Sequence, residues 1–313
     1  MKEIYFAGGC FWGVEHFFKG VDGVVNTTPG YANGSLESPS YEQVYTDTTG
    51  HAETVKVEYN PEKVSLQQLT RLFFAIIDPQ SLNRQGHDEG TRYRSGIFYA
   101  DEADLPAIKE VFDRVPGKVV TELEPLGCFF PAEEYHADYL DKNPGGYCHL
   151  SLKTFRYLRL YQDLKLVLEG EADPITRMAQ ISAYIQERMG FFWTGFYRVS
   201  LSSRETPSLS SRAESRDLEL LLGPFQGPPA CMRIKYGRGV CGSAWKEKRT
   251  LVVPDVEEFP GHIACSAESR SEIVVPVIRG GEVTAVLDID SKEIGTFDRT
   301  DAAFLEMIVE DCA

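Results

Sequence analysis

Long apolar runs are missing from this chain of 313 residues. A helix that crosses a membrane needs roughly 20 consecutive apolar residues, and no segment approaches that length. The first residues also lack a basic stretch followed by a long apolar run, which is the pattern of a secretory signal peptide. We therefore expect a cytoplasmic protein that does not enter a membrane.

An excess of positive charge is missing as well. The chain has 32 Lys and Arg against 47 Asp and Glu, so its formal net charge is -15 at pH 7. A nucleic-acid partner would require a basic face that neutralises phosphates. The charge therefore argues against nucleic-acid binding, and the composition (42% apolar and 25% charged residues) is typical of a globular protein.

Closely spaced cysteine pairs are the third absence. No Cys-x-x-Cys pair occurs, which argues against a zinc ribbon, and we expect no bound metal. An odd number of scattered cysteines in a cytoplasmic chain is not a disulfide framework, so reactive or merely buried thiols remain. The seven are Cys10, Cys128, Cys148, Cys231, Cys241, Cys265 and Cys312.

The length favours two domains, because one hydrophobic core rarely serves more than about 250 residues. In residues 1–155 the periodicity predicts strands alternating with helices, in an order that indicates a two-layer α/β (α+β) fold of the βαββαβ type. The predicted strands are 2–7, 53–60, 95–101 and 118–126, and the predicted helices are 11–20, 65–77 and 103–115. From 128 to 152 the pattern loosens into Pro, Gly and aromatic residues, a composition that often carries function.

Residues 156–313 have a different pattern of predicted helices and strands, which indicates a second α/β domain. Its strands and helices are expected to form one sheet flanked by helices, with a polar loop at 200–217. The predicted strands are 191–199, 218–223, 231–235, 250–255, 272–278 and 282–290, and the predicted helices are 157–170, 174–190, 241–248 and 298–312.

One cysteine stands where a strand gives way to a helix, in the segment AGGCFWG at 7–13. A single cysteine such as Cys10 is most often a buried and unreactive side chain. At a helix N-terminus, however, free N–H groups and the helix dipole favour the thiolate of Cys10. Gly8 and Gly9 let the backbone bend closely, and Phe11 and Trp12 offer an apolar surface for a methyl group. The segment therefore indicates a nucleophile.

Seven segments, the first of which contains Cys10, match a known family in order. Over roughly residues 1–155 the chain resembles the A-type peptide methionine sulfoxide reductases, which reduce the S epimer of the sulfoxide. The segments that carry the resemblance are GCFWG at 9–13, GYANG at 30–34, SPSYEQV at 38–44, GHAETV at 50–55, HDEGTRYRS at 87–95, AEEYHADYL at 132–140 and GGYC at 145–148.

This resemblance implies a role for each matching residue. Cys10 would attack the sulfoxide sulfur, Glu53 would protonate the departing oxygen, and Cys148 would then condense with the Cys10 sulfenic acid. An external dithiol such as thioredoxin would reopen that disulfide, so no bound cofactor is expected. The remaining implied roles are hydrogen bonds to the oxygen from Tyr41 and Tyr93, shaping of the site by Asp88, and a methyl pocket of Phe11 and Trp12. Arg92 departs from the family, which commonly has Gln there.

Over about 156–313 the chain resembles the GAF-type reductases of free methionine (R)-sulfoxide. The segments are FWTGFY at 192–197, CMRIKYGRGVCGSA at 231–244, FPGHIACS at 259–266, SRSEIVVP at 269–276 and VLDIDS at 286–291. The resemblance implies Cys265 as nucleophile, Cys231 as resolving thiol with Cys241 as an alternative, and Glu272 as the acid. It further implies that Asp288 and Asp290 hold the substrate ammonium group, and that Trp193 and Tyr197 close the pocket. Ser266 replaces the Asp usual after the nucleophile.

Together the two halves predict a bifunctional methionine sulfoxide reductase that acts on oxidised proteins and on the free amino acid. Two alternatives stay open at this point. The second half could be a non-catalytic GAF sensor of a small ligand or of redox state, and the first half could be a thiol peroxidase-like enzyme. A homodimer formed through the GAF half is also expected.

Overall fold

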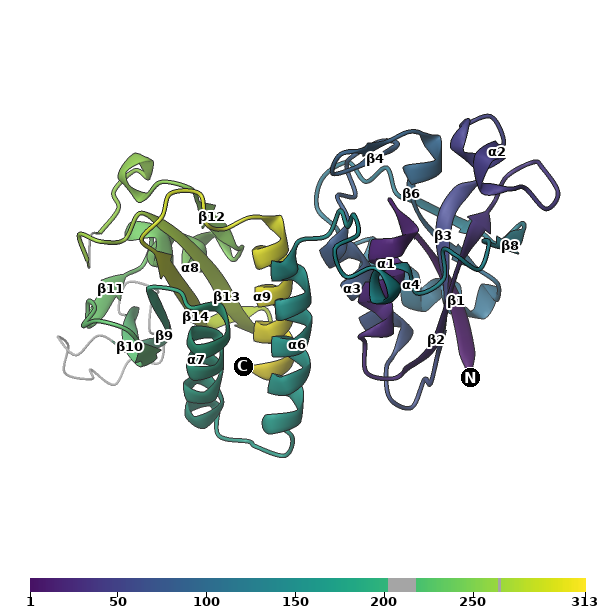
Figure 1. Cartoon of the computed structure of the whole chain (residues 1–313). Helices are drawn as coiled ribbons and strands as arrows, with labels where there is room; N and C mark the ends of the chain where they lie inside the picture. Colours follow the sequence, from purple (N-terminus) through teal and green to yellow (C-terminus); the bar gives the residue numbers. More distant parts are fainter. Residues whose placement is uncertain (202–217, 264–265) are drawn as a thin grey trace. The chain divides into compact units, whose positions relative to one another are not determined.

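The computed structural model describes residues 1–201, 218–263 and 266–313 (Figure 1). They form two compact units, Met1–Phe155 and Arg156–Ala313, each with its own sheet. Of the polar loop expected at 200–217, Ser200 and Leu201 continue a strand, and the rest lies outside the described residues.

The first unit is built on a six-stranded sheet in the order β7-β6-β1-β3-β2-β8. Neighbouring strands are antiparallel except for β6 and β7. The strands are β1 (Lys2–Gly8), β2 (Val24–Ala32), β3 (Ala52–Tyr59), β6 (Ser95–Tyr99), β7 (Glu122–Pro125) and β8 (Phe129–Pro131), with a small separate pair, β4 (Arg84–Gln85) and β5 (Asp88–Glu89). The α-helices are α1 (Phe11–Lys19), α2 (Tyr41–Tyr45), α3 (Leu66–Ile76), α4 (Leu105–Phe112) and α5 (Tyr139–Lys142).

Strand β2 is the main element that the sequence pattern misses. Its segment VVNTTPGYA has no clean alternation of apolar and polar residues, and Pro29 cannot donate a backbone hydrogen bond. It nevertheless pairs with β3 over most of its length and with β8 at its end. Tertiary pairing thus overrides a weak local signal.

Aromatic packing explains the two layers of this unit. The Phe6 ring of β1 stacks on Phe18 of α1 and on Phe73 of α3, with ring centroids 4.7 Å apart in both pairs. Both helices therefore cover the same face of the sheet. The opposite face carries a smaller core that includes Tyr5 and Phe98, against which Phe129 packs.

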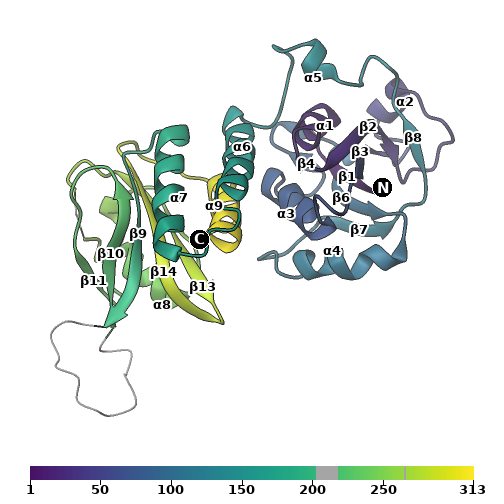
Figure 2. The same cartoon turned by 90° about the horizontal axis from the view of Figure 1, so that it is seen from below.

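The second unit is a six-stranded antiparallel sheet in the order β11-β10-β9-β14-β13-β12. Helix α8 packs on one face, and α7 and α9 pack on the other (Figure 2). The strands are β9 (Trp193–Leu201), β10 (Leu218–Gln226), β11 (Arg233–Lys235), β12 (Leu251–Val253), β13 (Ser271–Arg279) and β14 (Glu282–Ser291). The α-helices are α6 (Leu152–Val167), α7 (Pro174–Met189), α8 (Gly239–Glu247) and α9 (Arg299–Cys312).

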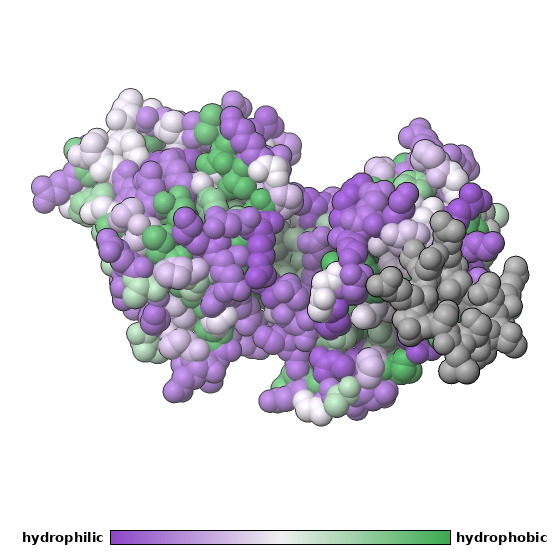
Figure 3. Space-filling model, turned by 180° about the vertical axis from the view of Figure 1, so that it is seen from behind, coloured by the Kyte–Doolittle hydropathy of each residue, from purple (hydrophilic) through white to green (hydrophobic). Residues whose placement is uncertain are grey.

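Helix α6 joins this second unit through α9. The buried Tyr157 ring stacks on Phe304, and its hydroxyl donates a hydrogen bond to Asp301 at 2.8 Å. Within the described residues, no helix is both long and apolar enough to span a bilayer. Figure 3 shows one molecular face, on which hydrophilic side chains predominate and apolar ones are interspersed.

Candidate active sites

Cys10 lies at the turn between β1 and α1, as the sequence pattern indicates. It is the N-cap residue of α1, and Gly9 before it has φ +83°, a conformation that side chains with a Cβ rarely adopt. A Cβ on Gly9 would also come within 2.7 Å of the Gln85 side chain. The glycine is therefore required both for the turn and for the close approach of the β4 segment.

The Cys10 thiol is only 5% exposed, and burial raises its pKa well above the ordinary value. The neighbouring Glu53 raises the pKa further, whereas the backbone N–H of Trp12 lowers it. The N–H groups at the helix N-terminus act to favour the thiolate, but desolvation of the buried thiol has the larger effect on its pKa.

Glu53 of β3 lies beside this thiol and is 2% exposed. Its Oε2 accepts a hydrogen bond from the backbone N–H of Phe11 at 3.1 Å. Burial raises the pKa of Glu53 to about 8, although that hydrogen bond and the Arg92 charge both act to lower it. At pH 7 this carboxyl group is therefore mostly protonated and can donate a proton.

Two tyrosines share this environment. Tyr93 is buried and Tyr41 is half-buried, and burial together with the Glu53 charge raises the pKa of both, to about 12 for Tyr41. Both phenols are thus neutral O–H donors. The Tyr41 backbone N–H donates to Glu133 Oε1 at 2.8 Å, and the Tyr31 hydroxyl donates to Glu133 Oε2 at 2.7 Å.

An aromatic cluster lies beside the thiol. The Trp12 ring stacks on Tyr139 at 3.8 Å between centroids, and its indole N–H donates to His136 Nδ1 at 3.1 Å. The Phe11 ring lies 5.0 Å from the buried His136 ring. Sequence reasoning missed Glu133, His136 and Tyr139 as supporting residues, although all three fall in the segment AEEYHADYL.

Cys148 reaches this site from the irregular segment that follows α5. A Cβ on Gly13 of α1 would lie 3.2 Å from Cys148 Sγ, so the thiol is close to the first turn of α1. Burial raises the pKa of the Cys148 thiol, and the Asp88 charge adds to that effect. Asp88 also raises the pKa of Cys10. The structure therefore gathers all eight residues expected in the first half around the start of α1.

The second unit contains a partly enclosed pocket. Strand register explains its polar lining, because Glu272 lies opposite Asp290, and Asp290 lies opposite Trp193. Residues an even number apart along a strand share a face, so Asp288 joins Asp290, and Tyr197 joins Trp193. Cys241 of α8 completes this set of expected residues that line the pocket.

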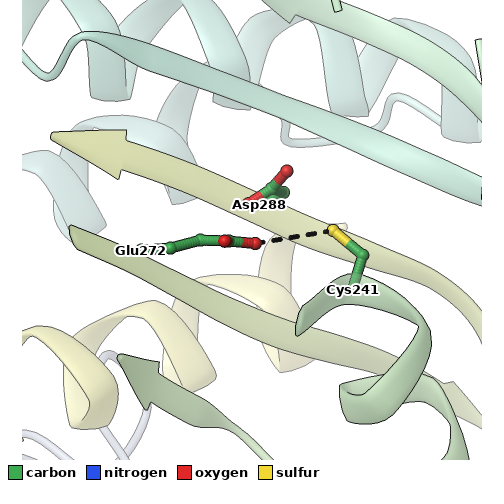
Figure 4. A group of neighbouring side chains, drawn as sticks. All are labelled: Cys241, Glu272 and Asp288. Atoms are coloured by element: carbon green, nitrogen blue, oxygen red, sulfur yellow. Dashed lines mark hydrogen bonds between the residues drawn. The ribbon is translucent and has the colours of Figure 1, made fainter. Parts of the chain in front are cut away.

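Three of these side chains lie close together (Figure 4). Cys241 Sγ lies 3.9 Å from Glu272 Oε1, and Asp288 has an oxygen within 4.8 Å of both groups. Burial raises the pKa of all three, and neighbouring carboxylates add to the effect. Burial likewise raises the pKa of Asp290 to about 6.

Cys231, expected as the resolving thiol, is not among the residues that line this pocket. Cys231 is half-buried, packs against the adjacent core and is disulfide-bonded. Cys265 lies outside the described residues. His262 was not anticipated, and its Nε2 lies 3.8 Å from Glu272 Oε2. Ser266, the departure noted in the sequence, lines the pocket.

Comparison with known proteins assigns the family. The family described as peptide methionine sulfoxide reductase matches residues 2–165, more than half of the chain. The chain belongs to this family. A GAF domain follows at residues 173–313. The family match extends into α6, a helix that packs in the second compact unit.

Individual relatives match each half. Peptide methionine sulfoxide reductase MsrA of Clostridium acetobutylicum is 54% identical over 154 residues, which is 48% of this chain and 95% of the relative. The solved free methionine-R-sulfoxide reductase from Neisseria meningitidis is 42% identical and covers 51% of this chain and 88% of its own, with a TM-score of 0.45. Mxr1 from Saccharomyces cerevisiae is 43% identical and covers 48% of this chain and 91% of its own, with a TM-score of 0.46.

Arg92, the departure from the family pattern, is built into the first site. Its guanidinium pairs with Asp47 and lies 4.4 Å from the centre of the Tyr93 ring. Only 8% of the residue is exposed. Burial sets the pKa of Glu53 above its ordinary value, and the positive charge of Arg92 moves that pKa downward. Arg92 therefore tunes the acid.

Replacing Arg92 with Gln should extend activity on the S epimer to higher pH. Loss of the positive charge raises the pKa of Glu53, so the proton donor stays protonated further into the alkaline range, by on the order of one pH unit. The measurement is the alkaline limb of the kcat/KM profile. Arg92→Lys, which keeps the charge, should stay near wild type, and an unchanged limb in Arg92→Gln would contradict the tuning role.

Proposed function

We propose that this chain is a bifunctional methionine sulfoxide reductase, in which the first half reduces the S epimer and the second half reduces the free R epimer. The observation that carries the proposal is a buried carboxyl group with a raised pKa next to a thiol in each half: Glu53 with Cys10, the proposed nucleophile, and Glu272 with Cys241, an alternative resolving thiol. A thiol and a proton donor are the two groups that sulfoxide reduction requires.

In the first half the aromatic cluster would hold the substrate methyl group, and Tyr41 and Tyr93 would donate hydrogen bonds to the sulfoxide oxygen. Cys10 sulfur attacks the sulfoxide sulfur and forms a transient S–S bond while Glu53 protonates the oxygen. The hydroxyl group then moves to Cys10 sulfur as that S–S bond breaks, which gives the Cys10 sulfenic acid and releases methionine. The Cys10 thiol proton returns to Glu53, so atoms and protons balance without a bound cofactor.

Regeneration would use the second thiol of this half. Cys148 attacks the Cys10 sulfenic acid, which forms a disulfide and releases water. Residues 147–149 belong to no helix or strand, which makes it easier for Cys148 to move. Movement is needed because the sulfurs of Cys10 and Cys148 must come within about 2 Å of each other to form a disulfide bond. A thioredoxin-type dithiol then reduces the disulfide by exchange and becomes oxidised itself.

In the second half the substrate would be the free amino acid. Asp288 and Asp290 are placed on one sheet face in the pocket, where carboxylates pair with a substrate ammonium group. Glu272 would protonate the sulfoxide oxygen, Cys265 would attack the sulfur, and Cys231 or Cys241 would resolve the sulfenic acid. Trp193 and Tyr197, stacked 5.9 Å apart, would close over the methyl end.

The alternatives are less well supported. A sensor pocket needs neither a buried thiol nor a carboxyl group next to it, so the Cys241–Glu272 contact favours catalysis. A thiol peroxidase needs no aromatic cluster beside its thiol. We further propose a cytoplasmic location, where dithiol reductants are present, and a dimer formed through the second half.

The test is an assay that resolves the two epimers with the full chain. We expect reduction of the S epimer both as free methionine sulfoxide and in an N-acetylated form, and reduction of the R epimer only when it is free. Acetylation removes the ammonium charge that the Asp pair binds. Failure to reduce free R-sulfoxide would remove the proposal for the second half, and failure to reduce S-sulfoxide would remove it for the first.

A further inference from the structure

The pocket of the second unit brings together three potential metal ligands from one helix and two strands. They are Cys241 of α8, Glu272 of β13 and Asp288 of β14. We propose that a thiophilic divalent cation, with Zn²⁺ as its representative, binds this cluster and closes the pocket to the sulfoxide. The blocking effect rests on the proposed function, whereas the cation site itself does not.

The spacing of the donor atoms fits one small cation. Cys241 Sγ and Glu272 Oε1 are 3.9 Å apart, and one donor atom from each of the three residues lies within 4.8 Å of the others. In a tetrahedral site with Zn–S of about 2.3 Å and Zn–O of about 2.0 Å, sulfur and oxygen lie about 3.5 Å apart. Small side-chain rotations would therefore complete the coordination (Figure 4).

The cluster also has an unsatisfied donor atom. Asp288 is 6% exposed, and its Oδ1 has no hydrogen-bond partner within the described part of the chain. Cys241 and Glu272 are buried to a similar degree, at 3% and 6% exposed. Buried acids in contact require a compensating positive charge or a proton. A cation at this point would satisfy the orphaned oxygen and replace the protons of the neighbouring acids.

The chemistry of the ligands selects the class of cation. One sulfur and two carboxylate oxygens suit Zn²⁺ better than Mg²⁺ or Ca²⁺, which prefer all-oxygen sites. His262 Nε2, 3.8 Å from Glu272 Oε2, could supply a fourth ligand. The Cys241 thiol is not disulfide-bonded in this structure, so its sulfur is available as a ligand.

Occupancy by a cation would oppose substrate binding directly. Asp288 and Glu272 are the groups proposed to hold the substrate ammonium and to protonate its oxygen, and a metal would engage both. The sequence predicts no metal here, because the ligands are far apart along the chain and no Cys-x-x-Cys pair is present. Folding of β13 and β14 next to α8 creates the cluster.

The experiment measures metal binding to the reduced full chain without using its activity. The protein is reduced with a phosphine, because a dithiol would itself bind zinc, and Zn²⁺ is titrated in competition with a chromophoric chelator. Co²⁺ in a parallel titration reports sulfur ligation through its thiolate charge-transfer band. We expect Cys241→Ser, Glu272→Gln and Asp288→Asn each to weaken binding by about 10-fold or more.

Matched variants separate this site from other thiols. Cys128→Ser, Cys312→Ser and Cys10→Ser should bind Zn²⁺ as the wild type does. No binding, or binding unchanged in Cys241→Ser, would overturn the cation site. With zinc bound, reduction of free R-sulfoxide should fall by about 10-fold or more while S reduction stays within about twofold.

The two proposals fail in different ways. If metal-free protein does not reduce R-sulfoxide although zinc binding depends on Cys241, the proposed function of this half is wrong and the cation site stands. If R reduction proceeds equally with zinc bound, the blocking effect is wrong and the reductase assignment stands.

Discussion

Replacing Cys10 with serine should abolish reduction of methionine (S)-sulfoxide and leave reduction of free (R)-sulfoxide at the wild-type rate. The oxygen of the sulfoxide has to be accepted by a nucleophilic sulfur, which becomes a sulfenic acid. A serine hydroxyl is a far weaker nucleophile and cannot form that species. Loss of S activity to the background level is therefore the expected result.

The substitution should leave the fold intact, which makes the result interpretable. Cys10 is the N-cap residue of α1, and serine is among the preferred residues at that position. We therefore expect the thermal unfolding of the first unit to change little. A large fall in its melting temperature would show that lost activity came from lost structure.

Two comparison variants complete this prediction. Cys265→Ser should abolish reduction of the free R epimer and leave S reduction unchanged. Cys128→Ser removes a half-buried thiol that contacts His51 and the Gly34 carbonyl, and it should leave both activities intact. Persistent S reduction in Cys10→Ser would mean that another thiol is the nucleophile.

Replacing Glu53 with glutamine should reduce kcat/KM for the S epimer by about 10²–10⁴-fold, the range lost with a general acid. Glutamine has nearly the same shape and can still accept the Phe11 backbone N–H bond. It has no carboxyl proton to donate. In the wild type, kcat/KM should fall as pH rises past about 8, because burial places the pKa of Glu53 there. The Glu53→Gln variant should not show this fall in kcat/KM at alkaline pH.

The same substitution should stabilise the first unit at alkaline pH. The folded-state pKa of Glu53 is about 8, above the ordinary value of 4.5, so between these values the folded chain holds a proton that the unfolded chain releases. Stability contributed by this proton is lost as pH rises through that window. At pH about 8 the glutamine variant should exceed the wild type by up to a few kcal/mol in free energy of unfolding.

Urea unfolding of wild type and variant across this pH window measures the difference. Glu15, whose pKa burial raises to about 7, also makes the wild type pH-dependent, so only the difference between the two proteins reports Glu53. Glu15→Gln serves as the control, because it should change stability but not S reduction. A Glu53→Gln protein that keeps activity within about tenfold would contradict the role of this acid.

Local sequence patterns were enough to predict much of the architecture. The alternation in β1, the Gly pair and the apolar spacing of α1 place Cys10 at a strand-to-helix turn, as observed. The helices α3, α7 and α9 follow the same logic of amphipathic spacing and capping. Strand β2 was not predicted from the local pattern, because it is held by pairing with β3 and β8 rather than by the preferences of its own residues.

The chemistry of the sites was only partly readable from the sequence. Motifs in family order singled out Cys10, Glu53 and Cys148, and the structure gathers them at one helix end. The supporting roles of Glu133 and His136 depend on contacts between segments about 90 to 125 residues apart, which no local pattern records.

By itself the sequence determined the two-part organisation, the order of most elements and the residue types available for sulfur chemistry. Only the tertiary structure decided the protonation of those residues and the meeting of Cys241 with Glu272 and Asp288. The physical reason is that periodicity and capping act over a few residues, whereas desolvation and charge coupling depend on neighbours from distant segments. Cys10 is the clearest instance, because the helix N-terminus favours its thiolate whereas burial raises the pKa of the thiol well above its ordinary value.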